Sequence, residues 1–84
     1  MMKNSVLKNV GKEIVFSFRF SSGGYNRGKI IRVDEEKELV RLRYDLFNGK
    51  RKYEWFSDFM IMNITSYSGR RKEWIDRCYD NMLP

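Results

Sequence analysis

The dipeptide Asn48-Gly49 most constrains what this chain can fold into. Both residues accept positive φ angles, which makes the pair the strongest short signal for a tight β-hairpin. The segment before it, residues 39–45 (LVRLRYD), alternates apolar and basic side chains, as a strand with one buried face does. Residues 52–56 (KYEWF) follow the turn. We therefore predict two antiparallel strands joined at Asn48-Gly49.

Three further segments have strand character. Residues 13–20 place four apolar side chains on one face at a period of two: Ile14, Phe16, Phe18 and Phe20. A flexible turn at residues 21–24 (SSGG) leads to a second strand at about residues 25–33, where Gly28 indicates a bulge or a close backbone approach. Residues 59–64 (FMIMNI) form the last strand. Five short strands joined by hairpin-like turns predict a small barrel, whose closure removes exposed sheet edges.

The sequence pattern changes to a helical one after residue 65. Trp74, Ile75, Cys78, Tyr79 and Met82 recur at the spacing of one helix face, which we expect to pack on the barrel. We therefore predict three parts: an N-terminal arm (residues 1–9), the barrel (residues 10–65) and a C-terminal amphipathic helix (residues 66–84).

The charge balance is strongly basic. Seventeen Lys and Arg residues stand against eleven Asp and Glu residues, giving a net charge of +6. This surplus favours nucleic acid or an acidic protein surface as a partner. Cys78 is the only cysteine and the chain has no histidine, so no internal disulfide and no Cys/His zinc site can form, and a reducing compartment fits best.

The chain also lacks an apolar run of the length found in signal peptides or membrane spans. We therefore expect a cytoplasmic or nuclear protein, in the host cytoplasm if it is viral, that is neither secreted nor held in a membrane. Its oligomeric state is expected to be a monomer or a homodimer.

The motifs of enzymes are missing from this sequence. It contains no Ser-centred elbow, no Walker loop and no His-based metal motif. The acidic run at residues 34–38 fills a predicted surface turn, and Cys78 lies on the apolar helix stripe, where packing is expected rather than nucleophilic chemistry. We expect a non-catalytic protein with no metal and no other cofactor.

Basic residues form three clusters that indicate contacts with phosphates. If Val40 and Leu42 face the core, Arg41 and Arg43 project together from the opposite face of their strand. A second cluster follows the hairpin turn and a third begins the C-terminal helix, while aromatic rings near the turn suit stacking on a base. The predicted nucleic-acid-binding residues are Arg41, Arg43, Lys50, Arg51, Lys52, Arg70, Arg71, Lys72, Phe47 and Tyr53.

The third cluster is unfavourable for a helix by itself, because cations in the first turn oppose the helix dipole. In one interpretation, Ser66, Ser68 and Gly69 let the backbone close around an anion at a helix N-terminus made more positive by Arg and Lys. In the other, Arg70 and Arg71 precede the helix and lie in water or pair with Glu73.

Residues 10–59 resemble the Tudor domain, a member of the SH3-like small barrels. The similarity is carried by VGK at residues 10–12, NRGKI at 26–30 with VD at 33–34, YDLFNG at 44–49 and FSDF at 56–59. The resemblance implies a five-stranded SH3-like, Tudor-like barrel.

Many Tudor domains also hold a methylated Lys or Arg in an aromatic cage through cation–π attraction. The matching positions are Phe20, Asn26, Tyr44 and Phe47, with Tyr25 beside the non-aromatic Asn26. The alternative is that Phe20 and Tyr44 are ordinary core rings.

Two kinds of function follow from these patterns. The first is a basic binding module that contacts nucleic acid or regulates a nucleoprotein complex. The second is a protein-binding module, either a Tudor-like reader of methylated side chains or a small adaptor or inhibitor such as a virus-encoded regulator. The sequence leaves DNA, RNA and protein partners open.

Overall fold

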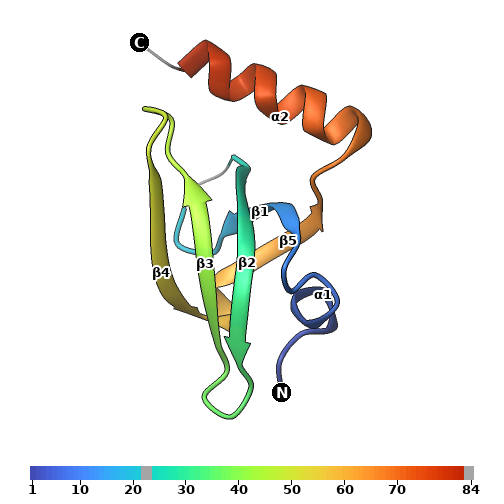
Figure 1. The fold of residues 1–84 in the computed structure, drawn as a ribbon, viewed down its shortest axis with the longest axis vertical. Coiled ribbons are helices and arrows are strands. Elements are labelled where there is room, and N and C mark those ends of the chain that lie inside the picture. Colours follow the sequence, from blue (N-terminus) through green and yellow to red (C-terminus); the bar gives the residue numbers. More distant parts are fainter. Residues whose placement is uncertain (22–23, 83–84) are drawn as a thin grey trace.

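A computed structural model describes residues 1–21 and 24–82. Within these residues, five strands, two α-helices and one 3-10 turn follow one another (Figure 1). In order they are α1 (Asn4–Leu7), β1 (Glu13–Phe18), β2 (Asn26–Asp34), β3 (Leu39–Asp45), β4 (Arg51–Ser57), η1 (Asp58–Met60), β5 (Ile61–Ser66) and α2 (Gly69–Met82). Within the described residues, no helix has the length and apolar character needed to cross a membrane.

The five strands form a single antiparallel sheet in the order β4-β3-β2-β1-β5. The predicted mainly-β architecture with a C-terminal helix is therefore confirmed. β4 and β5 lie at the two ends of the sheet and do not pair with each other in the described part of the chain. Closure into a barrel stays a prediction.

Several element boundaries differ from those expected from the sequence. β1 ends at Phe18 rather than continuing to Phe20, and η1 takes up Phe59 before β5 begins. The predicted N-terminal arm contains α1, whose Val6 is buried in the core together with Met2. The predicted turn at residues 21–24 falls partly on residues 22 and 23, and the predicted helix ends on residues 83 and 84, all of which lie outside the described residues.

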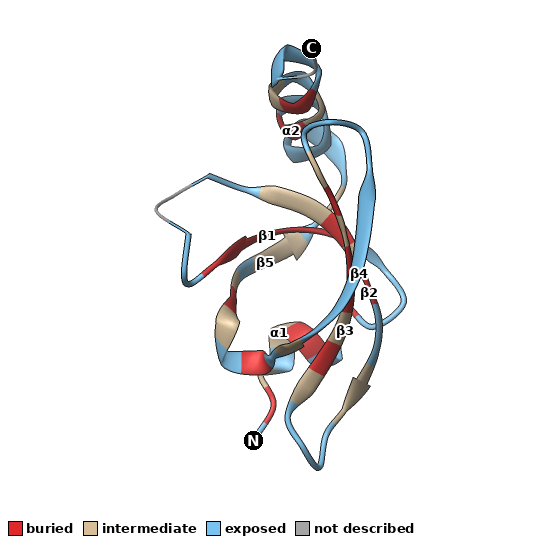
Figure 2. Cartoon of the chain, turned by 90° about the vertical axis from the view of Figure 1, so that its left-hand side faces the viewer, coloured by how far each residue is buried: buried red, intermediate tan, exposed pale blue. Residues whose placement is uncertain are grey.

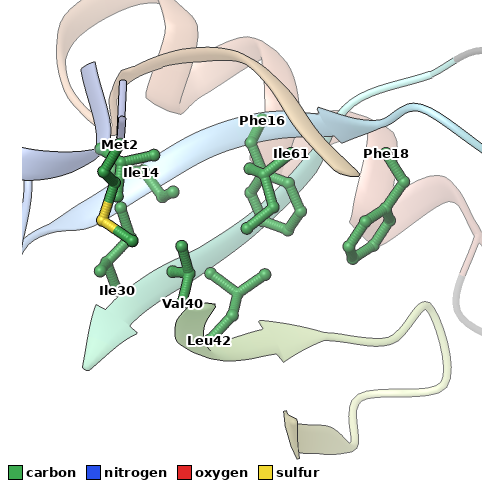
Figure 3. Packing of buried hydrophobic residues seen from close by; sticks show 9 residues of the cluster. Met2, Ile14, Phe16, Phe18, Ile30, Val40, Leu42 and Ile61 are labelled. Carbon is green, nitrogen blue, oxygen red and sulfur yellow. The ribbon is translucent and has the colours of Figure 1, made fainter. Parts of the chain in front are cut away.

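The main core lies on the concave side of the sheet, and we call this side the inner face. Viewed from the side, the strands curve around the buried residues (Figure 2). Aliphatic and aromatic side chains from α1 and from four strands meet there (Figure 3). The fully or nearly fully buried members are Met2, Val6, Ile14, Phe16, Phe18, Ile30, Val40, Leu42 and Ile61.

A β-bulge in β2 determines which of its side chains face outward. Ile30 pairs with Leu42, but the next pair is Arg32 with Arg41, so Ile31 is an extra residue in β2. The extra residue shifts the alternation by one position. As a result Val33 packs against the core while Arg32 lies on the opposite face, level with Arg41.

Helix α2 packs on the outer side of β1 through a second, smaller core. Ile75 and Tyr79 are buried against Val15, with Tyr67 packed beside them. The predicted helix stripe is thus only partly buried, because Trp74 and Met82 are exposed. This face of Val15 is available to the helix because its neighbours Ile14 and Phe16 point into the main core.

Gly28 is required where β2 and β3 approach each other. A Cβ atom at this position would lie 2.2 Å from the backbone carbonyl oxygen of Arg43. We expect Gly28→Ala to lower the free energy of unfolding by about 3 kcal/mol, because the two central strands must separate to admit the methyl group. Urea denaturation measures this. Gly69→Ala, where a Cβ atom meets nothing within 4 Å, should cost only the roughly 1 kcal/mol of a left-handed backbone conformation. An equal loss in both variants would contradict the close approach.

Candidate nucleic-acid interface

Cations and aromatic rings from β2, β3 and β4 share the face of the sheet opposite the main core, which we call the outer face. The strand register places them in three rows across the strands, and their neighbours in sequence point into the core. The outer-face residues are Arg27, Lys29 and Arg32 of β2, Arg41, Arg43 and Asp45 of β3, and Arg51, Tyr53 and Trp55 of β4.

The row farthest from α2 joins two arginines to a tryptophan. Arg41 pairs with Arg32 on one side and with Trp55 on the other. The guanidinium carbons of Arg32 and Arg41 lie 5.5 Å and 5.8 Å from the centroid of the Trp55 ring, which is 41% exposed. Each contact is a cation–π interaction of modest strength at an exposed site. The row therefore presents an accessible indole ring on the edge strand, beside two positive charges.

The middle row combines an exposed tyrosine with a buried arginine. Tyr53 is 53% exposed, and it pairs with Arg43, which in turn pairs with Lys29. Arg43 is only 8% exposed, and its Nη2 donates to Glu13 Oε2 at 2.6 Å. Arg43 was predicted to contact phosphate. The structure instead places its guanidinium group inside an ion pair, because a buried cation must be neutralised.

The row nearest α2 is a network of ion pairs rather than a set of available charges. Arg27 Nε donates to Asp45 Oδ2 at 2.9 Å, and Arg27 Nη1 donates to Asp76 Oδ1 at 2.6 Å. Arg51 Nε lies 3.5 Å from Asp45 Oδ1. The Tyr79 hydroxyl accepts from the Arg27 N–H and donates to the Asp45 carbonyl, each at 3.1 Å. This network fixes α2 to the ends of β2 and β3.

The pKa values of Asp76 and of its neighbour Tyr67 reflect these contacts. Burial alone would raise the pKa of Asp76, but hydrogen bonds from Tyr67, Lys72 and Arg27 outweigh it and hold the pKa below its ordinary 3.8. Burial and the hydrogen bond to Asp76 raise the pKa of Tyr67 to about 12. The Asp76 contribution to stability is present above the ordinary carboxyl pKa and is lost as the pH falls through the lower folded-state pKa. The Tyr67 contribution is present below the ordinary phenol pKa and is lost as the pH rises toward about 12.

Three outer-face cations remain without a carboxylate partner. Among the described residues, Lys29, Arg32 and Arg41 form no ion pair, whereas Arg27, Arg43 and Arg51 each do. We define the basic aromatic patch as Lys29, Arg32, Arg41, Tyr53 and Trp55. A hollow of about 350 Å³, lined by Asp34, Lys37, Leu39 and Trp55, adjoins it.

The other predicted phosphate-contacting residues are not gathered on this patch. Lys52 pairs with Tyr44 and lies on the inner side of β4, and Lys50 lies in the hairpin turn, where its N–H donates to Asn48 Oδ1 at 3.0 Å. Phe47 packs on Tyr79 with 4.7 Å between ring centroids.

The basic cluster at the start of α2 lies near a different surface feature. Arg70 is exposed, and Lys72 pairs with Asp76 at 3.1 Å. Arg71 lines a groove of about 380 Å³ together with Val15, Tyr25, Asn63, Ile64, Thr65 and Trp74. Ser66 Oγ and Ser68 Oγ lie 3.1 Å apart and hydrogen-bond to each other. The predicted anion site at this helix start stays a prediction.

The five residues predicted for an aromatic cage do not surround one common centre. Phe20 stacks on Phe18, which also contacts Tyr44 edge-to-face. Tyr25 packs edge-to-face on Trp74, and Phe47 packs on Tyr79. Asn26 pairs with Phe16 in the β1–β2 ladder. Phe20 and Tyr44 therefore lie in one aromatic cluster, while Tyr25 and Phe47 pack against α2.

Sequence reasoning missed Lys29, Arg32 and Trp55. Trp55 had no direct signal: a two-residue Asn48-Gly49 turn would pair Arg41 with Phe56, whereas the observed hairpin is closed by Leu46 and Lys50 and pairs Arg41 with Trp55. Arg32 had no sequence signal either, since its face depends on the bulge at Ile31.

Comparison with protein-family models, with curated proteins and with solved structures finds no match for this chain. Its function must therefore be inferred from the chemistry of its own surface.

We expect Tyr67→Phe to raise the pKa of Asp76 toward its ordinary value and to lower the free energy of unfolding by about 1–2 kcal/mol, because a charged acceptor loses a donor. NMR titration of the Asp76 carboxyl and urea denaturation measure the two effects. Tyr53→Phe is the matched control, since the exposed Tyr53 lies outside this network. An unchanged Asp76 pKa in Tyr67→Phe would contradict the role given to this hydrogen bond.

Proposed function

We propose that this protein is a non-catalytic module that binds single-stranded nucleic acid on the basic aromatic patch. The observation that carries the proposal is the row of Arg32, Arg41 and Trp55, in which an accessible ring lies beside two cations that have no carboxylate partner among the described residues. Surfaces that bind single strands combine these features: cations follow the backbone, and aromatic rings stack on the bases.

The patch suits an extended single strand better than a duplex. Tyr53 and Trp55 are two residues apart on β4, so their Cα atoms lie roughly 7 Å apart on the same face. Two unpaired bases of an extended strand can stack on these rings, whereas the bases of a duplex are already stacked on one another. Lys29, Arg32 and Arg41 then neutralise the phosphates. Ring stacking and phosphate contacts carry little sequence information, so we expect little sequence preference.

The same features are compatible with the SH3-like small-barrel class suggested by the Tudor-like motifs. Antiparallel pairing throughout, the strand order β4-β3-β2-β1-β5 and the strong curvature of the sheet support this assignment. In such a fold the outer face of β2, β3 and β4 is a solvent-facing surface outside the barrel core. A protein partner with an acidic surface is the alternative ligand, since it offers the same charge but no stacked bases.

Salt dependence tests the electrostatic half of the proposal. Three phosphate contacts on a single strand predict a slope of about −2 for the logarithm of the binding constant against the logarithm of the salt concentration. We expect Arg32→Ala/Arg41→Ala to weaken binding at least about tenfold and to reduce the slope by about 1.4. Fluorescence anisotropy with labelled DNA and RNA oligonucleotides measures both quantities.

Arg77→Ala is the matched control for charge alone. Arg77 is exposed on α2, two residues from both buried positions Ile75 and Tyr79, and so points away from the sheet. It should change affinity far less than the double variant. A flat salt dependence, or an equal loss in both variants, would refute binding at the patch.

Trp55 tests the stacking half. In a Trp74→Phe background Trp55 is the only tryptophan, and we expect its fluorescence to be quenched as oligonucleotide binds. Trp55→Ala should weaken binding about tenfold to hundredfold, as the loss of one stacked base does. An acidic polypeptide that binds equally well before and after Trp55→Ala, with no oligonucleotide binding, would favour the protein-binding alternative instead.

A further inference from the structure

β4 is the outermost strand of the sheet, at the left of Figure 1, and in the described part of the chain it pairs with β3 alone. Its seven residues are all exposed except Phe56, which is half-buried. Its ladder with β3 runs from Asp45↔Arg51 to Leu39↔Ser57 without a register shift. A long, regular edge with free backbone groups is a template for pairing with another strand.

The hydrogen-bond pattern shows which backbone groups point away from the sheet. The Leu46 N–H donates to the Lys50 carbonyl at 2.7 Å, and the Asp58 N–H donates to the Glu38 carbonyl at 2.9 Å. Antiparallel ladders alternate between bonded and non-bonded pairs, so the even-numbered β4 residues between these points bond to β3. The N–H and C=O groups of Arg51, Tyr53 and Trp55 therefore point outward from the edge.

The side chains of this edge are complementary to a second copy of the same strand in one register. When β4 pairs antiparallel with itself and Tyr53 lies opposite Tyr53 of the second copy, Lys52 lies opposite Glu54 and Arg51 lies opposite Trp55. Opposite charges placed directly across two strands are stabilising and like charges are destabilising. Centring the pair on Lys52 or on Glu54 instead places two like charges face to face.

We propose that two copies of this protein associate through β4, antiparallel and centred on Tyr53, to form one continuous sheet. Tyr53 exchanges two backbone hydrogen bonds with its counterpart, and Arg51 does so with Trp55 of the second copy. The two-fold axis is perpendicular to the sheet, so the outer faces of both copies lie on the same side. The association does not require nucleic acid, and it joins the two basic aromatic patches into one surface.

The opposite edge of the sheet is less suited to this pairing. The register of β5 shifts against β1, and Asn63 adopts a φ of 55° at that irregularity. Bulges of this kind disrupt an edge and limit its pairing with other chains. Exposed Lys on an edge also opposes pairing in general, but in β4 each Lys52 meets a Glu54 of the second copy.

Charge exchange tests the proposed register. Sedimentation of the full chain without nucleic acid, from about 10 μM to about 1 mM, should reveal a monomer–dimer equilibrium. Lys52→Glu and Glu54→Lys should each raise the dissociation constant at least about tenfold, because each creates two like-charged pairs across the axis. Equal amounts of the two single variants should form a mixed dimer, since each acidic side chain of one variant then lies opposite a basic side chain of the other. The double variant Lys52→Glu/Glu54→Lys should dimerise like the original chain.

Tyr53→Pro tests the backbone contacts separately. Its N–H points away from β3, so the β3–β4 ladder keeps its hydrogen bonds while the edge loses a donor. Circular dichroism should show that the variant is folded, and sedimentation should show that it no longer dimerises. A chain that is monomeric up to about 1 mM would overturn the proposal. A dimer that is unaffected by both single charge changes would also overturn it, because it would use another surface.

Discussion

The burial of Val40 and Leu42 determines where the charges of this protein lie. Both side chains are fully enclosed in the main core, so the two-residue period of β3 sends Arg41 and Arg43 to the outer face. A register shift of one residue would bring both guanidinium groups into an apolar interior, at several kcal/mol for each unpaired charge. Core packing and the position of the cations are therefore a single constraint, and the bulge at Ile31 extends it to Arg32 in the neighbouring strand.

The position of α2 then divides the outer-face cations into two groups. Near the helix, Arg27 is held between Asp45 and Asp76, and Arg43 is enclosed beside Glu13. Arg27 holds the helix on the sheet through Asp76, and both cations are already neutralised. Beyond the reach of the helix, Arg32 and Arg41 lie beside the exposed ring of Trp55. One face of one sheet thus provides both the attachment of α2 and a surface with free positive charge.

Local sequence signals predicted the strands well and the site only in part. Alternation and the Asn48-Gly49 turn gave β3 and the hairpin, because both depend on neighbouring residues. The burial of Arg43 could not be predicted, since its partner Glu13 belongs to a strand that is distant in sequence and reaches it only through β2. The ring of Phe47 is exposed, as the turn predicts, but Tyr79 of the docked helix packs against it, a contact that the local sequence does not indicate. Lys52 was grouped with Arg51 by sequence proximity, although neighbours on a strand point to opposite faces.

The two edges of the sheet differ in a way that monomer stability does not explain. The β5 edge is interrupted by the positive φ of Asn63 and preceded by η1, both of which shorten the regular backbone available to another strand. The β4 edge is regular, carries Tyr53 and Trp55 in solvent, and alternates their rings with Lys52 and Glu54. Rings left half exposed contribute less hydrophobic stabilisation than rings placed in the core, which this chain already fills with Phe16 and Phe18. The composition of β4 is therefore better explained by contacts with other molecules than by the folding of the single chain.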